Sequence, residues 1–196
     1  MRSKITGVAR CKVSSRSNNQ RTGRVPDSAG GRRALLNYTG MRLSPNFTLA
    51  QFIRSETATR LGLSNQPGTE HVANLRRLAA SLEQVRRLLG HRLVISSGFR
   101  APALNAAVGG APSSRHALGL AADFTCPRHG STLDAARAVV GSRIEFDLLI
   151  YEYGRWVHFQ LSPHGFEPRR QVLTICNADD GYKDGLIACS QDGDAP

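Results

Sequence analysis

An acidic residue stands inside one of the most apolar stretches of this chain, and it constrains how the chain can fold. Asp123 lies in the run LAADFT (120–125), which is typical of a β-strand. Burying its carboxylate between Ala122 and Phe124 costs free energy unless a cation meets it. His116 comes seven residues earlier, in SSRHALGLAAD. By itself the pair is either two polar residues in a well-packed strand or part of a metal site.

Two further polar side chains stand where an apolar core would exclude them. His158 lies in the apolar run WVHFQ, and Arg100 ends the motif SSGFR, just past a predicted strand. Zinc accepts imidazole nitrogen and carboxylate oxygen, and a catalytic zinc site uses three protein ligands and keeps one position open. Together with His116 and Asp123, these residues indicate a metal site built from distant parts of the chain.

Helix and strand signals are mixed along the chain, without the regular alternation of a doubly wound sheet. Thr48 and Gln51 form a capping-box pattern, and Phe47 and Phe52 occupy the positions of a hydrophobic staple. Further helices are predicted at about 68–89, from Pro102 onward, and at 131–141. Strands are predicted at 92–99, 120–125, 145–161 (as a hairpin) and 170–175. This order favours an α+β fold.

Charge divides the chain into a basic N-terminal arm and a nearly balanced remainder. The 196 residues carry a net charge of +11, and residues 1–40 hold nine Lys/Arg against one acidic residue, a net +8. This arm is predicted to be disordered, or not translated if synthesis starts at Met41. Residues 41–190 form the predicted domain and 191–196 a loose tail. Because the arm lacks interleaved aromatic residues and the remainder carries little net charge, we expect no nucleic-acid partner.

The compartment is indicated by signals that the sequence lacks. No apolar stretch of about 20 residues predicts a membrane span, and no apolar segment follows the basic N-terminus as in a secretory signal. We therefore expect synthesis in the cytoplasm, with access to a cell wall only if the protein is released, as a phage lysin is. We also expect a monomer. Cys11, Cys126, Cys176 and Cys189 form no CxxC pair, so we expect free thiols.

Three motifs resemble those of a known enzyme family. SSGFR (96–100), SSRHALGLAAD (113–123) and WVH (156–158) are similar to the signature of the zinc D-alanyl-D-alanine carboxypeptidase family (peptidase family M15), which also includes dipeptidases and phage L-alanyl-D-glutamate endopeptidases. The resemblance covers about 43–175. It implies a small antiparallel sheet that carries the zinc site, helices that flank the sheet, and substrates from the stem peptides of peptidoglycan.

The resemblance also implies a role for each matching residue. His116, Asp123 and His158 take the positions of the zinc ligands. Arg100 matches the arginine that binds substrate and stabilises the developing oxyanion. Ser114 matches a serine beside the first ligand that is expected to hydrogen-bond the substrate; the alternative is an ordinary turn residue.

The general base is where the chain departs from the family pattern. Many relatives place an acid three residues before the last histidine, where this chain has Arg155, which cannot accept a proton. Glu152 is the predicted substitute if 153–155 is a three-residue loop, because it then shares a face with His158 at about 7–8 Å. A two-residue loop would place Glu152 on the other face. Asp147 is the second candidate, although strand parity opposes it.

The sequence is compatible with two functions. The first is a zinc-dependent peptidase that hydrolyses peptide bonds of peptidoglycan, of the D,D-carboxypeptidase or L-Ala–D-Glu endopeptidase type. The second, prompted by Arg155, is a zinc-containing domain of the same fold that binds cell-wall peptides without turnover. Both require Zn²⁺, and they differ in whether Glu152 acts as a base.

Overall fold

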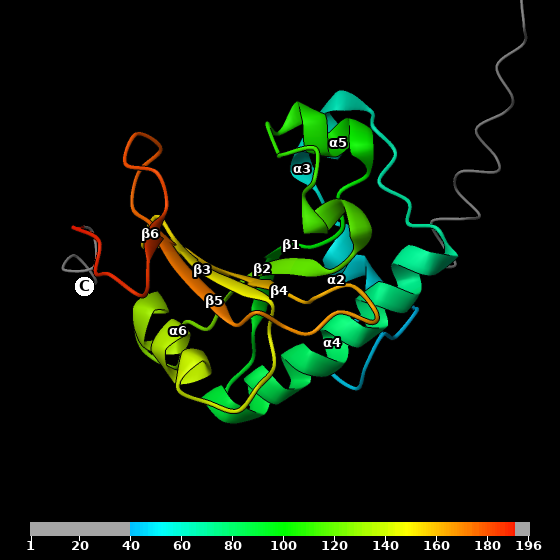
Figure 1. The fold of residues 1–196 in the computed structure, drawn as a ribbon. Helices are drawn as coiled ribbons and strands as arrows, with labels where there is room; N and C mark the ends of the chain where they lie inside the picture. The colour runs from blue at the N-terminus through cyan, green and yellow to red at the C-terminus, as the bar shows by residue number, and fades with distance from the viewer. Residues whose placement is uncertain (1–39, 191–196) are drawn as a thin grey trace, which may run out of the picture.

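The computed structural model describes residues 40–190, which form one sheet with helices on both sides (Figure 1). The predicted basic arm, apart from Gly40, and the predicted tail 191–196 lie outside the described residues. The helices are α2 (Leu49–Ile53), α3 (Glu56–Leu61), α4 (Thr69–Leu89), α5 (Pro102–Ala107), the 3₁₀ helix η1 (Arg115–Leu118) and α6 (Thr132–Val140). The strands are β1 (Val94–Ser97), β2 (Ala121–Thr125), β3 (Leu148–Glu152), β4 (Trp156–Gln160), β5 (Gln171–Ile175) and β6 (Lys183–Asp184). Within 40–190, no helix combines the length and the apolar composition needed to cross a bilayer.

The strands form one sheet in the order β1-β2-β4-β3-β5-β6, and the predicted α+β class is confirmed. Neighbouring strands are antiparallel except β3 and β5, which run parallel. The segment after β4 returns to the end of the sheet where β3 begins, and the Gln171 amide donates to the Asp147 carbonyl (3.0 Å). Because β5 starts beside the start of β3, both strands run in the same direction.

One face of the sheet is covered by α4 and α6, which lie beneath the strands in Figure 1. The apolar stripe predicted for 68–89 is the buried side of α4, and Gly90 ends the helix in the left-handed conformation (φ 73°). The core on this side includes Leu75, Leu78, Leu82 and Val85 of α4, Ala135, Ala136 and Val139 of α6, and Phe124, Leu149, Val157 and Phe159 of the strands.

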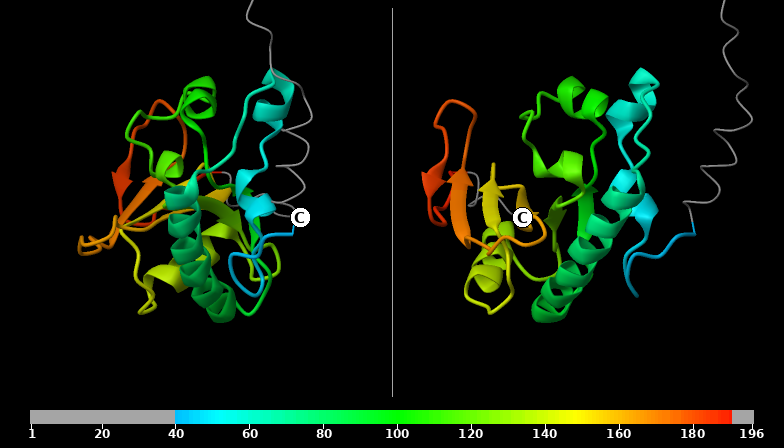
Figure 2. Two further views of the ribbon diagram at one scale, coloured as in Figure 1. Left: turned by 90° about the vertical axis from the view of Figure 1, so that its right-hand side faces the viewer. Right: turned by 45° about the vertical axis from the view of Figure 1, so that its right-hand side comes forward.

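The opposite face of the sheet carries the polar residues. Asp123 pairs with His158, and His158 pairs with Ile150, which shares its face with Glu152 two residues along β3. These side chains alternate with the core residues and so face away from α4 and α6. Figure 2 shows α5 and η1 standing over this side of the sheet.

The segment before α4 is held as the sequence predicts. The Thr48 amide donates to Oε1 of Gln51 (2.7 Å), and the rings of Phe47 and Phe52 meet edge to face at 5.9 Å. The Phe99 amide donates to the Phe52 carbonyl (2.7 Å). This last bond ties the end of α2 to the SSGFR motif.

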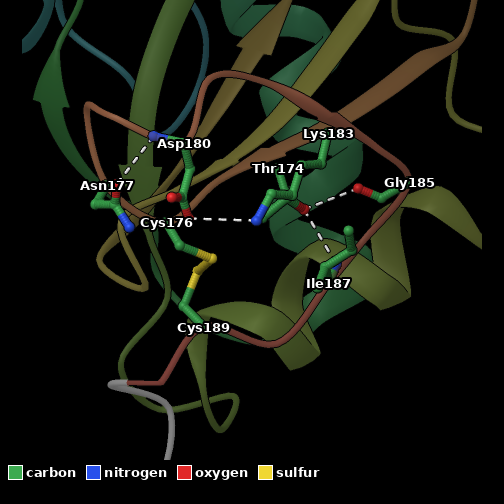
Figure 3. Close-up of a disulfide and its surroundings, with 8 residues drawn as sticks. All are labelled: Thr174, Cys176, Asn177, Asp180, Lys183, Gly185, Ile187 and Cys189. Atoms are coloured by element: carbon green, nitrogen blue, oxygen red, sulfur yellow. Dashed lines mark hydrogen bonds and ion pairs between the residues drawn. A yellow bond between two sulfur atoms is a disulfide. The ribbon is translucent and has the colours of Figure 1, made fainter.

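The cysteines correct one expectation. Cys176 and Cys189 form a disulfide with their Cα atoms 5.3 Å apart (Figure 3), whereas Cys126 is a buried free thiol. The two bonded cysteines are 13 positions apart and belong to no spacing motif, but the chain turns back between β5 and β6 and brings them together. The expectation of free thiols is therefore wrong for this pair, and Cys11 lies outside the described residues.

Glu83 is a buried carboxylate on α4 that anchors the chain before α2. Its Oε1 accepts from the Ser44 hydroxyl (2.8 Å) and the Asn46 amide (2.7 Å), and its Oε2 accepts from Arg86 (3.0 Å). Burial raises the pKa of Glu83, but the hydrogen bonds outweigh burial and lower the pKa from 4.5 to about 2. The fold therefore stabilises the ionised form.

We predict that Glu83→Gln lowers the free energy of unfolding at neutral pH by about 3 kcal/mol, measured by urea denaturation. A carboxylate with a depressed folded pKa contributes stability above its unfolded pKa of 4.5 and loses that contribution as the pH falls toward 2. The gap between wild type and variant should therefore close over this pH range. The control is Glu70→Gln, an exposed position on the same helix. A gap that is constant with pH would contradict the role of Glu83.

Candidate metal centre

Three buried side chains from separate elements meet on the polar face of the sheet. Asp123 on β2 pairs directly with His158 on β4, and η1 contributes His116. Nε2 of His116 lies 3.2 Å from Nδ1 of His158 and 3.2 Å from Oδ1 of Asp123, and Nδ1 of His158 lies 2.8 Å from the same oxygen. The structure therefore brings together the three residues expected to bind a metal ion.

The spacing of these donor atoms suits a tetrahedral metal site. Two ligand atoms that are each about 2.0–2.1 Å from a zinc ion, at a tetrahedral angle, lie about 3.3 Å apart. Two of the observed separations, both 3.2 Å, are close to that value, and the third, 2.8 Å between His158 and Asp123, is shorter. Two imidazole nitrogens and a carboxylate oxygen are also a donor set that zinc accepts. The cluster is positioned to hold a divalent metal ion.

A backbone carbonyl determines which nitrogen of His116 faces the cluster. Nδ1 of His116 lies 2.6 Å from the carbonyl oxygen of Gly98. A carbonyl can only accept, so Nδ1 carries the hydrogen and Nε2 keeps its lone pair for a metal ion. Such an outer partner is the usual way in which a protein orients a metal-binding histidine.

Glycine is required at position 98 because the backbone of α2 comes very close. A Cβ atom on Gly98 would lie 2.7 Å from the Cα atom of Phe52 and 2.8 Å from its Cβ atom. Any larger residue would push the end of β1 away from α2. The SSGFR motif thus supplies the carbonyl that orients His116 and the close contact that holds this carbonyl in place.

Charge in the cluster is balanced around Asp123. Burial raises the pKa of Asp123, but His116 and His158 outweigh burial and hold this pKa well below its usual range. Burial lowers the pKa of His158, and the interaction with Asp123 outweighs it and raises the pKa. At His116 burial dominates and lowers the pKa. An ionised carboxylate and a neutral His116 are the forms that bind metal ions.

The β3–β4 hairpin has the loop length on which the prediction for Glu152 depends. Glu152 pairs with Trp156, which leaves 153–155 as a three-residue loop, and the first two loop residues have φ values of 56° and 69°. Glu152 therefore lies on the same face as His158. Its Oε2 accepts a hydrogen bond from the indole of Trp156 (2.8 Å). Burial raises the pKa of Glu152, and the charge of His158 opposes this rise.

Asp147, the second candidate for the base, is engaged elsewhere. Its carboxylate accepts from the guanidinium of Arg169 at 2.8 and 2.7 Å and from the Gln160 amide at 2.8 Å. It also precedes β3, whereas Glu152 ends that strand. The structure does not bring Asp147 to the cluster.

Arg100 lies close to the three clustered residues, and Ser114 is near His116 along the chain. The Arg100 guanidinium is 3.8 Å from Oδ2 of Asp123. Its Nε is buried and has no hydrogen-bond partner among the described residues. Ser114 is the residue before η1, two positions before His116. A buried donor without a partner costs free energy, so a bound group that accepts a hydrogen bond from Arg100 would be favoured.

Asn65 is a positioning residue that no sequence signal marks. Its side-chain amide donates to the carbonyls of Ile53 (2.8 Å) and Phe99 (2.9 Å), and its Oδ1 accepts from the Ala101 amide (2.8 Å). These bonds fix the backbone on both sides of Arg100. A lone asparagine in a loop belongs to no motif, so only the tertiary structure identifies it.

We predict that Asp123→Asn weakens Zn²⁺ binding more than about 100-fold, because it removes the proposed anionic ligand. Loss of an outer hydrogen-bond partner usually weakens metal binding by about 10- to 100-fold, and loss of a direct ligand should have a larger effect. Isothermal titration calorimetry measures the affinity, and the fluorescence of Trp156, the single tryptophan, reports binding next to the cluster. The exposed Glu167→Gln variant is the control for a lost negative charge. Wild-type affinity in Asp123→Asn would exclude this aspartate as a ligand.

Comparison with known proteins places the site in a family. The family described as peptidase M15 matches residues 45–160, more than half of the chain. No curated protein matches the chain. The matched segment contains His116, Asp123 and His158 as well as Arg100 and Glu152, whereas β5, β6 and the disulfide follow it. The chain belongs to the peptidase M15 family.

Proposed function

We propose that the protein is a zinc-dependent peptidase that hydrolyses peptide bonds in the stem peptides of bacterial peptidoglycan. Membership of the peptidase M15 family supports a peptidase. The observation that carries the metal dependence is the convergence of one donor atom each from His116, Asp123 and His158, all within 4.8 Å of one another. The resemblance of the motifs supports the substrate class and leaves both bond types, D-Ala–D-Ala and L-Ala–D-Glu, open.

Zinc is the proposed ion, with His116, Asp123 and His158 as its ligands. Three protein ligands suit a catalytic site, because structural zinc sites normally use four. When bound, zinc supplies Lewis acidity that polarises a carbonyl group and activates water. The protein's own residues hold the reacting groups, move the proton and stabilise the developing charge.

Glu152 is the proposed general base. It lies on the same face of the sheet as His158, and the hydrogen bond from Trp156 restrains its carboxylate. In its ionised form it takes a proton from the attacking water and passes that proton to the leaving amine nitrogen. The raised pKa that burial gives Glu152 makes it a stronger proton acceptor.

Arg100 and Ser114 are the proposed substrate contacts. Arg100 is permanently charged, its Nε lacks a partner among the described residues, and it stands within 3.8 Å of a proposed ligand. It is therefore placed to stabilise the oxyanion of the tetrahedral intermediate. Ser114, at the start of η1, offers a hydroxyl for a hydrogen bond to the substrate backbone.

The disulfide supports action outside a reducing cytosol. Disulfides persist in oxidising compartments and are rare in the cytosol. The Cys176–Cys189 bond therefore favours an enzyme that is released to the cell wall, as a phage lysin is, over a cytosolic dipeptidase.

We predict that Glu152→Gln lowers kcat at least about 100-fold while zinc stays bound, because the amide keeps the shape of the side chain but cannot accept the proton. Stopped assays on stem peptides give kcat, and elemental analysis gives the zinc content. Arg155→Ala, on the same hairpin and exposed, is the matched control and should retain activity. Near-normal turnover in Glu152→Gln would exclude its role as base.

Digestion of purified peptidoglycan, followed by mass spectrometry of the released peptides, tests the proposed reaction and identifies the bond. We predict peptide release that a chelator abolishes and added Zn²⁺ restores. Zinc-dependent binding of stem peptides without any release would instead support the non-catalytic binding domain.

A further inference from the structure

A disulfide-closed loop follows β5, beyond the residues that match the family. In Figures 1 and 2 this loop rises on the same side of the sheet as α5 and η1, at the opposite end of the strand order. The strands that carry His158 and Glu152 lie between β2, which contacts η1, and the pair β5–β6, which carries the loop. The loop therefore borders the site on the side away from Arg100.

The base of the loop is fixed on the core side of the sheet. Cys189 packs with Leu133 of α6 and Tyr151 of β3 in a small apolar cluster, and Cys176 packs against the same cluster. The disulfide thus joins the two ends of the loop where they are buried.

A buried hydroxyl makes a second connection at the base of the loop. Thr174, which is fully buried, donates to the Gly185 carbonyl (2.8 Å) and accepts from the Ile187 amide (3.1 Å), as Figure 3 shows. The chain that returns from the loop is therefore held to β5 at two neighbouring points. With the disulfide, this leaves little freedom at the base of the loop.

The strand register, continued by one pair beyond β6, puts Tyr182 on the face of the proposed base. Thr174 pairs with Lys183, so continuing this register by one pair sets Ile175 opposite Tyr182. Ile175 in turn pairs with Glu152. Residues directly opposite one another point to the same face, so Tyr182 shares the face of Glu152 from two strands away. Two strand spacings are roughly 10 Å.

Tyr182 has the exposure of a ligand-binding aromatic residue. It is 60% exposed, whereas Ile175, Thr174 and Cys189 at the base of the loop are buried. Partial burial raises the pKa of its phenol, and the nearby charge of Glu152 raises it further, which agrees with the short separation given by the register. An aromatic ring that is held on a rigid loop can pack on a substrate at little entropic cost.

We propose that Tyr182, held by the Cys176–Cys189 loop, contacts the substrate two or three residues from the scissile bond and selects for longer stem peptides. This inference rests on the proposed peptidase function. The distance supports it, because roughly 10 Å corresponds to about three residues of an extended chain. A minimal peptide that spans only the scissile bond would not reach Tyr182.

The test compares a stem pentapeptide with the shortest fragment of it that the zinc-loaded wild type cleaves. For Tyr182→Ala we expect KM for the pentapeptide to rise about fivefold with kcat unchanged, the size of one aromatic packing contact. Both parameters should stay at wild-type values for the short fragment. Tyr182→Phe, which keeps the ring, should stay near wild type for both. Phe166→Ala, an exposed aromatic between β4 and β5, is the matched control.

The disulfide is tested by the Cys176→Ser/Cys189→Ser double variant, with circular dichroism to verify folding. We expect the same selective rise in KM for the pentapeptide. If this variant fails to fold, mild reduction of the wild type replaces it. An unchanged KM for the pentapeptide in Tyr182→Ala, or an equal loss for both substrates, overturns the inference.

A binding measurement separates this inference from the proposed function. In the Glu152→Gln background, fluorescence of Trp156 gives the Kd of the uncleaved pentapeptide, and adding Tyr182→Ala should weaken it by the same factor as KM. Absence of cleavage by the wild type contradicts the peptidase alone and leaves this Kd comparison decisive. Equal Kd values contradict the role of Tyr182 alone, and absence of any pentapeptide binding contradicts both.

Discussion

A buried carboxylate on β2, next to the edge strand β1, sets the conditions that the surrounding structure has to meet. Asp123 is only 8% exposed, and an uncompensated charge there would cost several kcal/mol. Compensation comes from His116 on η1, His158 on β4 and Arg100 beyond β1. These three residues belong to segments that are far apart in the chain. The charge of Asp123 therefore depends on three features of the fold: the register of β2 and β4, the position of η1, and the chain just after β1.

The residues around the cluster are held by backbone contacts as much as by side chains. The Gly98 carbonyl sets the tautomer of His116, and Asn65 bonds the backbone on both sides of Arg100. These contacts restrict the rotamers of a histidine and an arginine that could otherwise turn. Such preorganisation is what a hydrolytic site needs, because its donors must already be in place when charge develops.

The sequence allowed the helices and strands to be predicted because their signals are local. The grouping of His116, Asp123 and His158 was expected from polar residues within apolar runs and from the family resemblance, and the structure brings their donor atoms together. The apolar residues that recur every three or four positions in 68–89 predict a helix that buries one side. Charged side chains within apolar strands need charged or hydrogen-bonding partners on the same face of the sheet. The position of Glu152 followed from loop length and the two-residue period of a strand, and the observed pairing with Trp156 agrees.

Other features depend on contacts that no local signal encodes. Cys176 and Cys189 meet only because β5 and β6 pair, and β5 runs parallel to β3 only because the preceding segment returns along the sheet. Asn65 has no motif at all. The role of such residues depends on neighbours in space that are distant in the sequence.

The bond between the Phe99 amide and the Phe52 carbonyl has a practical consequence for dissecting this protein. None of the proposed metal ligands precedes position 116, so a fragment that begins after α2 would retain all of them. It would nevertheless lose α2, whose backbone at Phe52 packs against Gly98. Without that contact the Gly98 carbonyl would no longer hold His116 in a fixed orientation. A fragment that keeps the orientation of His116 must therefore start upstream of the staple at Phe47.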